Sequence, residues 1–173
     1  MLARTLRNRA ALFATLALTS AYAIVRYNVF KGVGWEHLPL YVLNKSIAWS
    51  SIVLLAIAAW QAVRTRGELV SNAHFVEGCA LAGLHVLMSL VLLTPANYQD
   101  FFGPSLRFTL SSEISMLAGV LAALSVSQAK RTLGFALFLP LAVLVHTTLL
   151  GARNWITPAT WPGSMIPITL LSA

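Results

Sequence analysis

Five apolar runs of about twenty residues each constrain this chain more than any other feature of its sequence. They lie at about 10–29, 41–63, 73–93, 108–127 and 133–152. A helix rises about 1.5 Å per residue, so about 20 residues are needed to cross the hydrocarbon core of a bilayer. The runs predict an all-α integral membrane bundle of five transmembrane helices. We expect a single transmembrane domain over residues 1–173.

The composition agrees with this prediction and excludes a water-soluble domain. The chain is 58% hydrophobic and 10% charged, whereas a soluble domain carries about 25% charged residues. Its net charge of +7 is compatible with nucleic-acid binding, but the basic residues flank the apolar runs, which is the pattern of membrane topology. We therefore expect a lipid bilayer and no nucleic acid as partner. The single cysteine, Cys79, rules out an internal disulfide and a cysteine-based iron–sulfur site.

The last twenty residues differ from the five runs because prolines interrupt them. These prolines are Pro158, Pro162 and Pro167. Proline removes a backbone donor and breaks a regular helix. We expect residues 154–173 to form an irregular interfacial tail, with Trp155 and Trp161 at the level of the lipid headgroups.

Basic residues in the loops predict the orientation. Seven fall on one side of the predicted bundle: Arg4, Arg7, Arg9, Arg64, Arg66, Lys130 and Arg131. Five fall on or near the other side: Arg26, Lys31, Lys45, Arg107 and Arg153. The excess places the N-terminus in the cytoplasm and the C-terminus outside a bacterial inner membrane.

The N-terminal run has a second interpretation. The basic segment 4–9, the apolar stretch and Ala21-Tyr22-Ala23 also fit a cleaved signal peptide. Cleavage would leave the other four spans in the same orientation.

Two histidines, His85 and His146, lie within the third and fifth runs. A polar side chain at bilayer depth is costly and usually has a partner, and imidazole is the commonest protein ligand of transition metals. The two runs are expected to be parallel, with a difference in ring depth of about 6 Å. This predicts one haem b whose iron is ligated by His85 and His146. The alternative is a buried histidine bonded to Ser or Thr on a neighbouring helix.

Other residues in the third and fifth runs bear on the haem prediction. Three small residues share faces with the two histidines and are expected to leave room for a porphyrin: Gly78, Ala82 and Ala142. Pro140 is expected to kink the fifth span. His74 shares a face with His85 and suits a second haem, but the start of the fifth run offers no second histidine. We therefore expect His74 to be an interfacial polar residue.

Further polar residues lie near the ends of the runs. His37 lies in the outer loop and is expected to be solvated. Lys45 and Glu113 are expected at similar depth in the membrane and can form a structural ion pair. The alternative interpretation is a proton or quinol site beside the haem. Glu77 lies one turn into the third run.

Four short segments carry a family resemblance. They are HFVEG at 74–78, LHVL at 84–87, KRTL at 130–133 and VLVH at 143–146. Together they resemble the ferric-reductase-like transmembrane family, and within it the haem-binding membrane subunits of bacterial methionine sulfoxide reductase systems. The resemblance covers about 72–155. It implies one haem rather than two, because the fifth run has one histidine and the spacing from His74 to His85 is shorter than in the family.

These observations predict an electron-transfer subunit of an oxidoreductase rather than a self-contained enzyme. We expect quinone or a partner redox protein to exchange electrons with the haem, within a larger membrane complex. The rival interpretation is a structural or assembly subunit without cofactor, which docks through the aromatic loop at 97–108 and the tail. A small transporter is a third class, but no matching half-sequences favour it.

Overall fold

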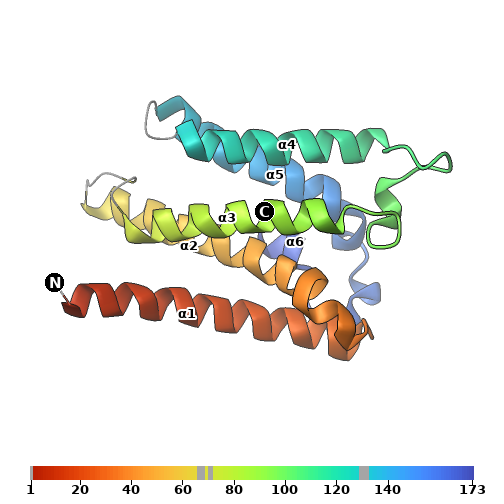
Figure 1. Ribbon diagram of the computed structural model, residues 1–173, viewed down its shortest axis with the longest axis horizontal. Coiled ribbons are helices and arrows are strands. Elements are labelled where there is room, and N and C mark those ends of the chain that lie inside the picture. The colour runs from red at the N-terminus through yellow and green to blue at the C-terminus, as the bar shows by residue number, and fades with distance from the viewer. Residues whose placement is uncertain (1, 66–68, 70–71, 129–132) are drawn as a thin grey trace. The chain divides into compact units, whose positions relative to one another are not determined.

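The chain folds into helices, as the sequence predicts. The computed structural model describes residues 2–65, 69, 72–128 and 133–173. Within these residues the only β interaction is an isolated antiparallel bridge between Phe102 and Phe108. The fold divides into two compact units, Met1–Met88 and Ser89–Ala173, and each is described by itself. Figure 1 shows the helices of both units.

The first unit is built on three long helices. Their bounds are α1 Leu2–Ile24, α2 Leu43–Thr65 and α3 Ala73–Leu92, whose last turn belongs to the second unit. Between α1 and α2 lie the π-helical turn η1 (Val25–Phe30), the 3₁₀ turn η2 (Trp35–His37) and the π-helical turn η3 (Leu38–Val42).

Hydroxyl groups join α1 to α2 in this unit. The Oγ1 of Thr19 lies 2.6 Å from the Oγ of Ser50, and the hydroxyl of Ser20 donates to Ser46 at 3.2 Å. Such polar contacts hold helices together where lipid provides no hydrophobic driving force.

The second unit pairs two long helices. After the 3₁₀ turn η4 (Gln99–Phe101) come α4 (Leu110–Gln128) and α5 (Leu133–Trp155). The Oγ1 of Thr109 accepts from the backbone N–H of Ser112 at 3.3 Å, which caps the start of α4. Helix α5 is continuous through Pro140, so the kink expected there stays a prediction.

The tail after α5 is partly ordered into helical turns. It contains the 3₁₀ turns η5 (Pro158–Thr160) and η6 (Pro162–Ser164) and a short helix α6 (Ile168–Leu171), which the sequence did not predict. The indole N–H of Trp155 donates to the Oγ1 of Thr169 at 3.0 Å, and Gly151 leaves space for that threonine. The tail therefore folds back on the end of α5.

Among the residues that the structure describes, three helical stretches are long and apolar enough to cross a membrane. They are Arg9–Phe30, Trp35–Thr65 and Ala73–Leu92, and a shorter apolar helix covers Leu110–Ala122. These stretches suggest a multi-pass membrane protein. Helices also occupy the positions of the fourth and fifth predicted spans. Three residues behind the predicted orientation, Arg66, Lys130 and Arg131, lie outside the described residues.

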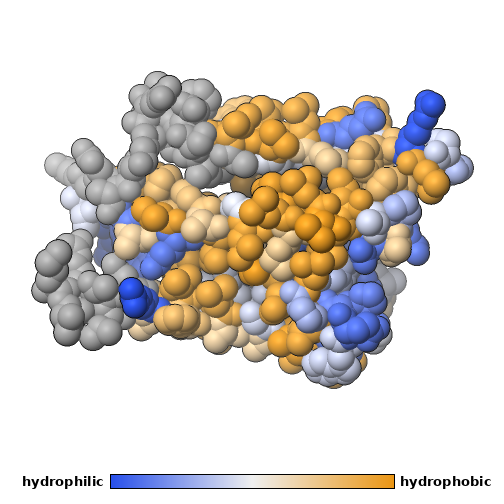
Figure 2. All heavy atoms as spheres, in the orientation of Figure 1, coloured by the Kyte–Doolittle hydropathy of each residue, from blue (hydrophilic) through white to orange (hydrophobic). Residues whose placement is uncertain are grey.

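Burial is distributed as expected for a protein in lipid. Twelve polar or charged residues and nine hydrophobic ones are buried among the residues described. Large apolar side chains are exposed instead, such as Leu18 at 72% and Val91 at 68%. Figure 2 shows hydrophobic side chains along the helices and hydrophilic ones gathered nearer their ends. Large exposed apolar side chains together with buried polar ones suggest a lipid bilayer around these helices.

Candidate functional site

His146 lies on α5 and is held by α4. Its Nδ1 lies 2.8 Å from the backbone oxygen of Ser115 and 3.2 Å from the hydroxyl oxygen of the same residue. A carbonyl oxygen can only accept, so Nδ1 carries a proton and donates it to Ser115. In the neutral imidazole the lone pair then belongs to Nε2.

Helix α4 is shaped around this ring. Gly119 lies one turn after Ser115, and a Cβ at Gly119 would lie 3.3 Å from the Nδ1 of His146. Ser115 itself is buried, at 1% exposure. Two small residues four apart thus let α4 approach the imidazole closely. Neither residue was predicted from the sequence, although two small residues four positions apart are a signal of close helix packing.

His85 lies on α3 and contacts α2. Its Nδ1 lies 2.8 Å from the Oδ1 of Asn44, a residue that is 1% exposed. With the amide oxygen of Asn44 facing the ring, this Nδ1 is placed to donate, and a neutral imidazole in that tautomer has its lone pair on Nε2. Asn44 was not predicted from the sequence, because its position at the start of the second predicted span gave no sign of its partner.

Gly78 corrects one expectation about the site. The hydroxyl of Ser51 on α2 donates to the backbone oxygen of Gly78 at 2.8 Å. A Cβ at Gly78 would lie 2.9 Å from the Cγ of Leu55. The prediction that Gly78 leaves room for a porphyrin is therefore wrong, because α2 fills this space. Of the other two small residues, Ala142 is buried and Ala82 is half-buried.

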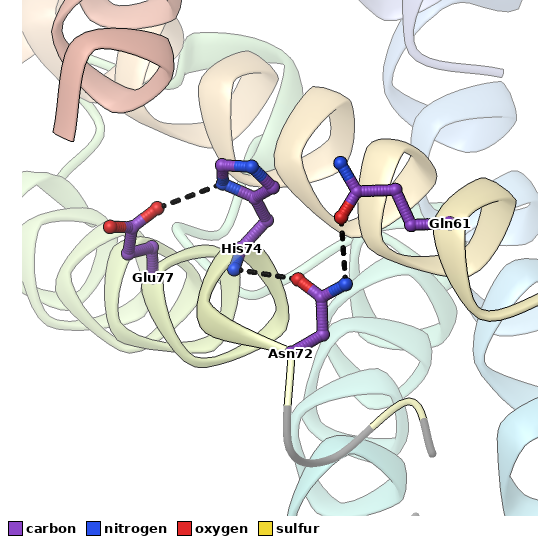
Figure 3. A network of polar contacts seen from close by, with 4 residues as sticks. All are labelled: Gln61, Asn72, His74 and Glu77. Atoms are coloured by element: carbon purple, nitrogen blue, oxygen red, sulfur yellow. Dashed lines mark hydrogen bonds and ion pairs between the residues drawn. The ribbon is translucent and has the colours of Figure 1, made fainter. Parts of the chain in front are cut away.

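His74 belongs to a polar network that joins the end of α2 to the start of α3 (Figure 3). Its Nδ1 lies 3.2 Å from the Oε2 of Glu77, and its side chain is only 7% exposed. The Oδ1 of Asn72 accepts from the backbone N–H of His74 at 2.9 Å, and the amide of Asn72 donates to Gln61 at 2.8 Å. Asn72 thus caps α3 and ties it to α2, so this network secures the connection between the helices.

The remaining polar candidates are His37, Lys45 and Glu113. His37 is about half exposed and its Nε2 lies 3.5 Å from the Oε1 of Glu36, in accordance with a solvated position. The ammonium of Lys45 lies 4.4 Å from the ring centre of Tyr41. Its expected ion-pair partner, Glu113, belongs to the second unit, and the pair stays a prediction.

The two central histidines likewise belong to different units, so their joint ligation of one iron stays a prediction. Among the residues described, no group of three or more His, Cys, Asp and Glu side chains is placed to hold a metal ion. Comparisons of this chain with protein-family models, with curated proteins and with solved structures find no match.

Proposed function

We propose that the chain is a five-span protein of a bacterial inner membrane that carries one b-type haem and transfers electrons. Its N-terminus lies in the cytoplasm and its C-terminus outside. The apolar helices and the buried polar side chains support the membrane location. The five-span count rests on α4 and α5, which are helical where the fourth and fifth spans are expected.

The hydrogen bond from the Nδ1 of His146 to the backbone oxygen of Ser115 carries the haem proposal. A histidine that ligates a metal usually donates its other ring N–H to a carbonyl or carboxylate, which fixes the tautomer and orients the ring. The contact between His85 and the Oδ1 of Asn44 has the same form. Both imidazoles thus have the tautomer that an axial ligand of iron requires.

The donor set fits a bis-histidine haem in its chemistry. His85 and His146 would hold the iron through their Nε2 atoms, with Asn44 and Ser115 fixing the ring orientations. Haem with two histidine ligands is six-coordinate and carries one electron at a time, which suits electron transfer. Quinone or a partner redox protein would exchange electrons with it, so the chain would act as an electron-transfer subunit of an oxidoreductase.

A second function is favoured by the same contacts. Each imidazole has a polar partner on a neighbouring helix, as a purely structural intramembrane histidine also would. The chain would then be a structural or assembly subunit without cofactor, and the two histidines would join α2 to α3 and α4 to α5.

An optical spectrum of the purified protein distinguishes the two functions. Sharp b-type bands in the reduced-minus-oxidised difference, with about one haem per chain, are expected for the first function. A featureless spectrum would contradict the haem proposal and favour the structural or assembly subunit. The variant His74→Ala serves as the control, because His74 is bonded to Glu77 and should leave haem content unchanged. Loss of half the haem in this variant would reveal a second haem site.

Topology is tested separately with reporter fusions. A reporter after Ala173 should lie outside, and one inserted between Gln128 and Arg131 should lie in the cytoplasm. A cytoplasmic C-terminus would contradict the five-span count whatever the haem content is.

A further inference from the structure

Three cations gather where α1 is joined to α2. We call Arg26, Lys31 and Lys45 the cationic cluster. Arg26 lies in the π-helical turn η1, Lys31 directly follows that turn, and Lys45 lies in the first turn of α2. The backbone N–H of Lys31 donates to the backbone oxygen of Arg26 at 3.0 Å, which fixes the two residues relative to each other.

One aromatic ring lies at the centre of this cluster. The ring centre of Tyr27 is 5.9 Å from the Cζ of Arg26, 5.7 Å from the Nζ of Lys31 and 5.2 Å from the Nζ of Lys45. Tyr41 packs edge-on to Tyr27, and Lys45 lies over its ring as well. A ring attracts each cation weakly through its quadrupole and does not neutralise it. Three like charges around one ring therefore attract an anion.

The local sequence carries an excess of positive charge. Residues 25–46 contain the three members of the cationic cluster and a single acidic residue, Glu36, whose carboxylate lies beside His37. Arg26 is only 5% exposed, so its charge is held inside the fold rather than dispersed in water. π-helical turns such as η1 are frequent at functional sites.

Asn28 adds a hydrogen-bond acceptor in the same turn. Its amide nitrogen donates to the backbone oxygens of Val33 at 2.9 Å and Gly34 at 3.3 Å. Its Oδ1 is buried and has no hydrogen-bond partner, although the residue is only 6% exposed. A buried acceptor of this kind requires a donor, such as a hydroxyl group of a ligand or a water molecule held by it.

We propose that the cationic cluster, with Tyr27, Tyr41 and Asn28, binds the phosphate of an anionic phospholipid whose headgroup also carries hydroxyl groups. Phosphatidylglycerol has this chemistry. Its phosphate meets the cations and the tyrosine hydroxyls, and its glycerol hydroxyls supply the donor that Asn28 requires. Basic pockets between membrane helices are a recurring form of lipid headgroup site.

Apolar side chains beside the cluster favour a lipid over free phosphate. Val29, Phe30 and Trp35 flank it in sequence and are 59%, 53% and 61% exposed. Such exposed apolar groups fit the glycerol and acyl-chain region of a lipid, and tryptophan is enriched at this depth of a membrane. Inorganic phosphate would gain nothing from them.

Lipid titrations of the full chain in a neutral detergent, followed by native mass spectrometry, test this site. Phosphatidylglycerol should bind more tightly than phosphatidylcholine, whose choline would face the cluster, and an excess of inorganic phosphate should not displace it. The double variant K31Q/K45Q should bind phosphatidylglycerol about 30-fold more weakly, since each basic residue near a lipid surface contributes about 1 kcal/mol, or about fivefold, to binding.

The matched control is R107Q/R153Q, which removes two exposed cations expected on the same side of the membrane. It should keep the affinity for phosphatidylglycerol, and circular dichroism should show both double variants equally helical. If both double variants bind phosphatidylglycerol equally weakly, net charge alone explains the effect and the proposal is overturned. Displacement of phosphatidylglycerol by inorganic phosphate would show that the site does not select a lipid, and would overturn the proposal. These readouts do not depend on haem, so they stand apart from the test of the proposed function.

Discussion

The helix pairs α2–α3 and α4–α5 each hold an imidazole through its Nδ1, but they use different acceptors. His85 donates to the side chain of Asn44, whereas His146 donates to the backbone oxygen of Ser115. A backbone oxygen is present whatever residue occupies the position, and its direction is set by the helix. A side-chain amide can be removed by one substitution. The comparison indicates that the contact of His146 with the backbone does not depend on the side chain at 115, whereas the contact of His85 with Asn44 depends on that amide.

Glycines near the two histidines also differ in what they contact. Gly119 on α4 faces the ring of His146, whereas Gly78 on α3 faces Leu55 and the backbone of Ser51 on α2. The same residue type thus makes room for an imidazole in one pair and for a helix in the other. A glycine one or two turns from a histidine does not by itself indicate space for a cofactor.

Removing either histidine should have the largest effect, and the loss of haem should be the same for the two helix pairs. In His85→Ala and His146→Ala, six-coordinate haem should be lost, because a bis-histidine site loses an axial ligand in both cases. The measurement is the reduced-minus-oxidised spectrum and the haem content per chain. If one variant keeps the spectrum of the unaltered protein, that histidine is no ligand, and the pairing across the two units is wrong.

Asn44→Leu should affect the α2–α3 pair and leave the contact between α4 and His146 unchanged. It removes the acceptor of His85, so the ring loses its fixed tautomer and orientation, and haem affinity should fall about 10-fold to 100-fold. Haem retention during dilution in detergent measures this change. Ser46→Ala is the matched control, because Ser46 is equally buried on α2 but bonds to Ser20. Similar haem loss in both variants would assign the effect to the packing of α2.

Gly119→Ala should have a smaller effect, confined to the α4–α5 pair. The new Cβ would lie 3.3 Å from the Nδ1 of His146, so the ring must shift by a few tenths of an ångström. Thermal unfolding should show Gly119→Ala to be about 1 kcal/mol less stable than Gly83→Ala, because both variants gain the helix preference of alanine and only Gly119→Ala is overpacked. Gly83→Ala is the control, since no atom lies within 4 Å of its Cβ and alanine favours the helix. If Gly119→Ala and Gly83→Ala are equally stable, the close approach of α4 to the ring is contradicted.

The long helices could be predicted from the sequence because each consists of one long apolar run. The expected third span at 73–93 is helix α3 at Ala73–Leu92. Partners across helices could not be read, because hydropathy does not say which face of one helix meets which face of another. Asn44 and Ser115 are polar residues in apolar runs, and only the fold assigns each to a histidine. The helix α6 was missed for a related reason, since it is stabilised by packing on α5 and follows a proline.

Ser115→Ala should have the smallest effect and gives the sharpest test of the comparison. The substitution removes the hydroxyl that lies 3.2 Å from the Nδ1 of His146 but leaves the backbone oxygen at 2.8 Å. Interhelical hydrogen bonds of this kind contribute about 0.6 kcal/mol in membrane proteins, so thermal stability should fall slightly. Haem affinity should stay within about twofold, because the acceptor that fixes the tautomer is retained. Haem loss as large as in Asn44→Leu would mean that the hydroxyl orients His146, and the two helix pairs would then hold their histidines in the same way.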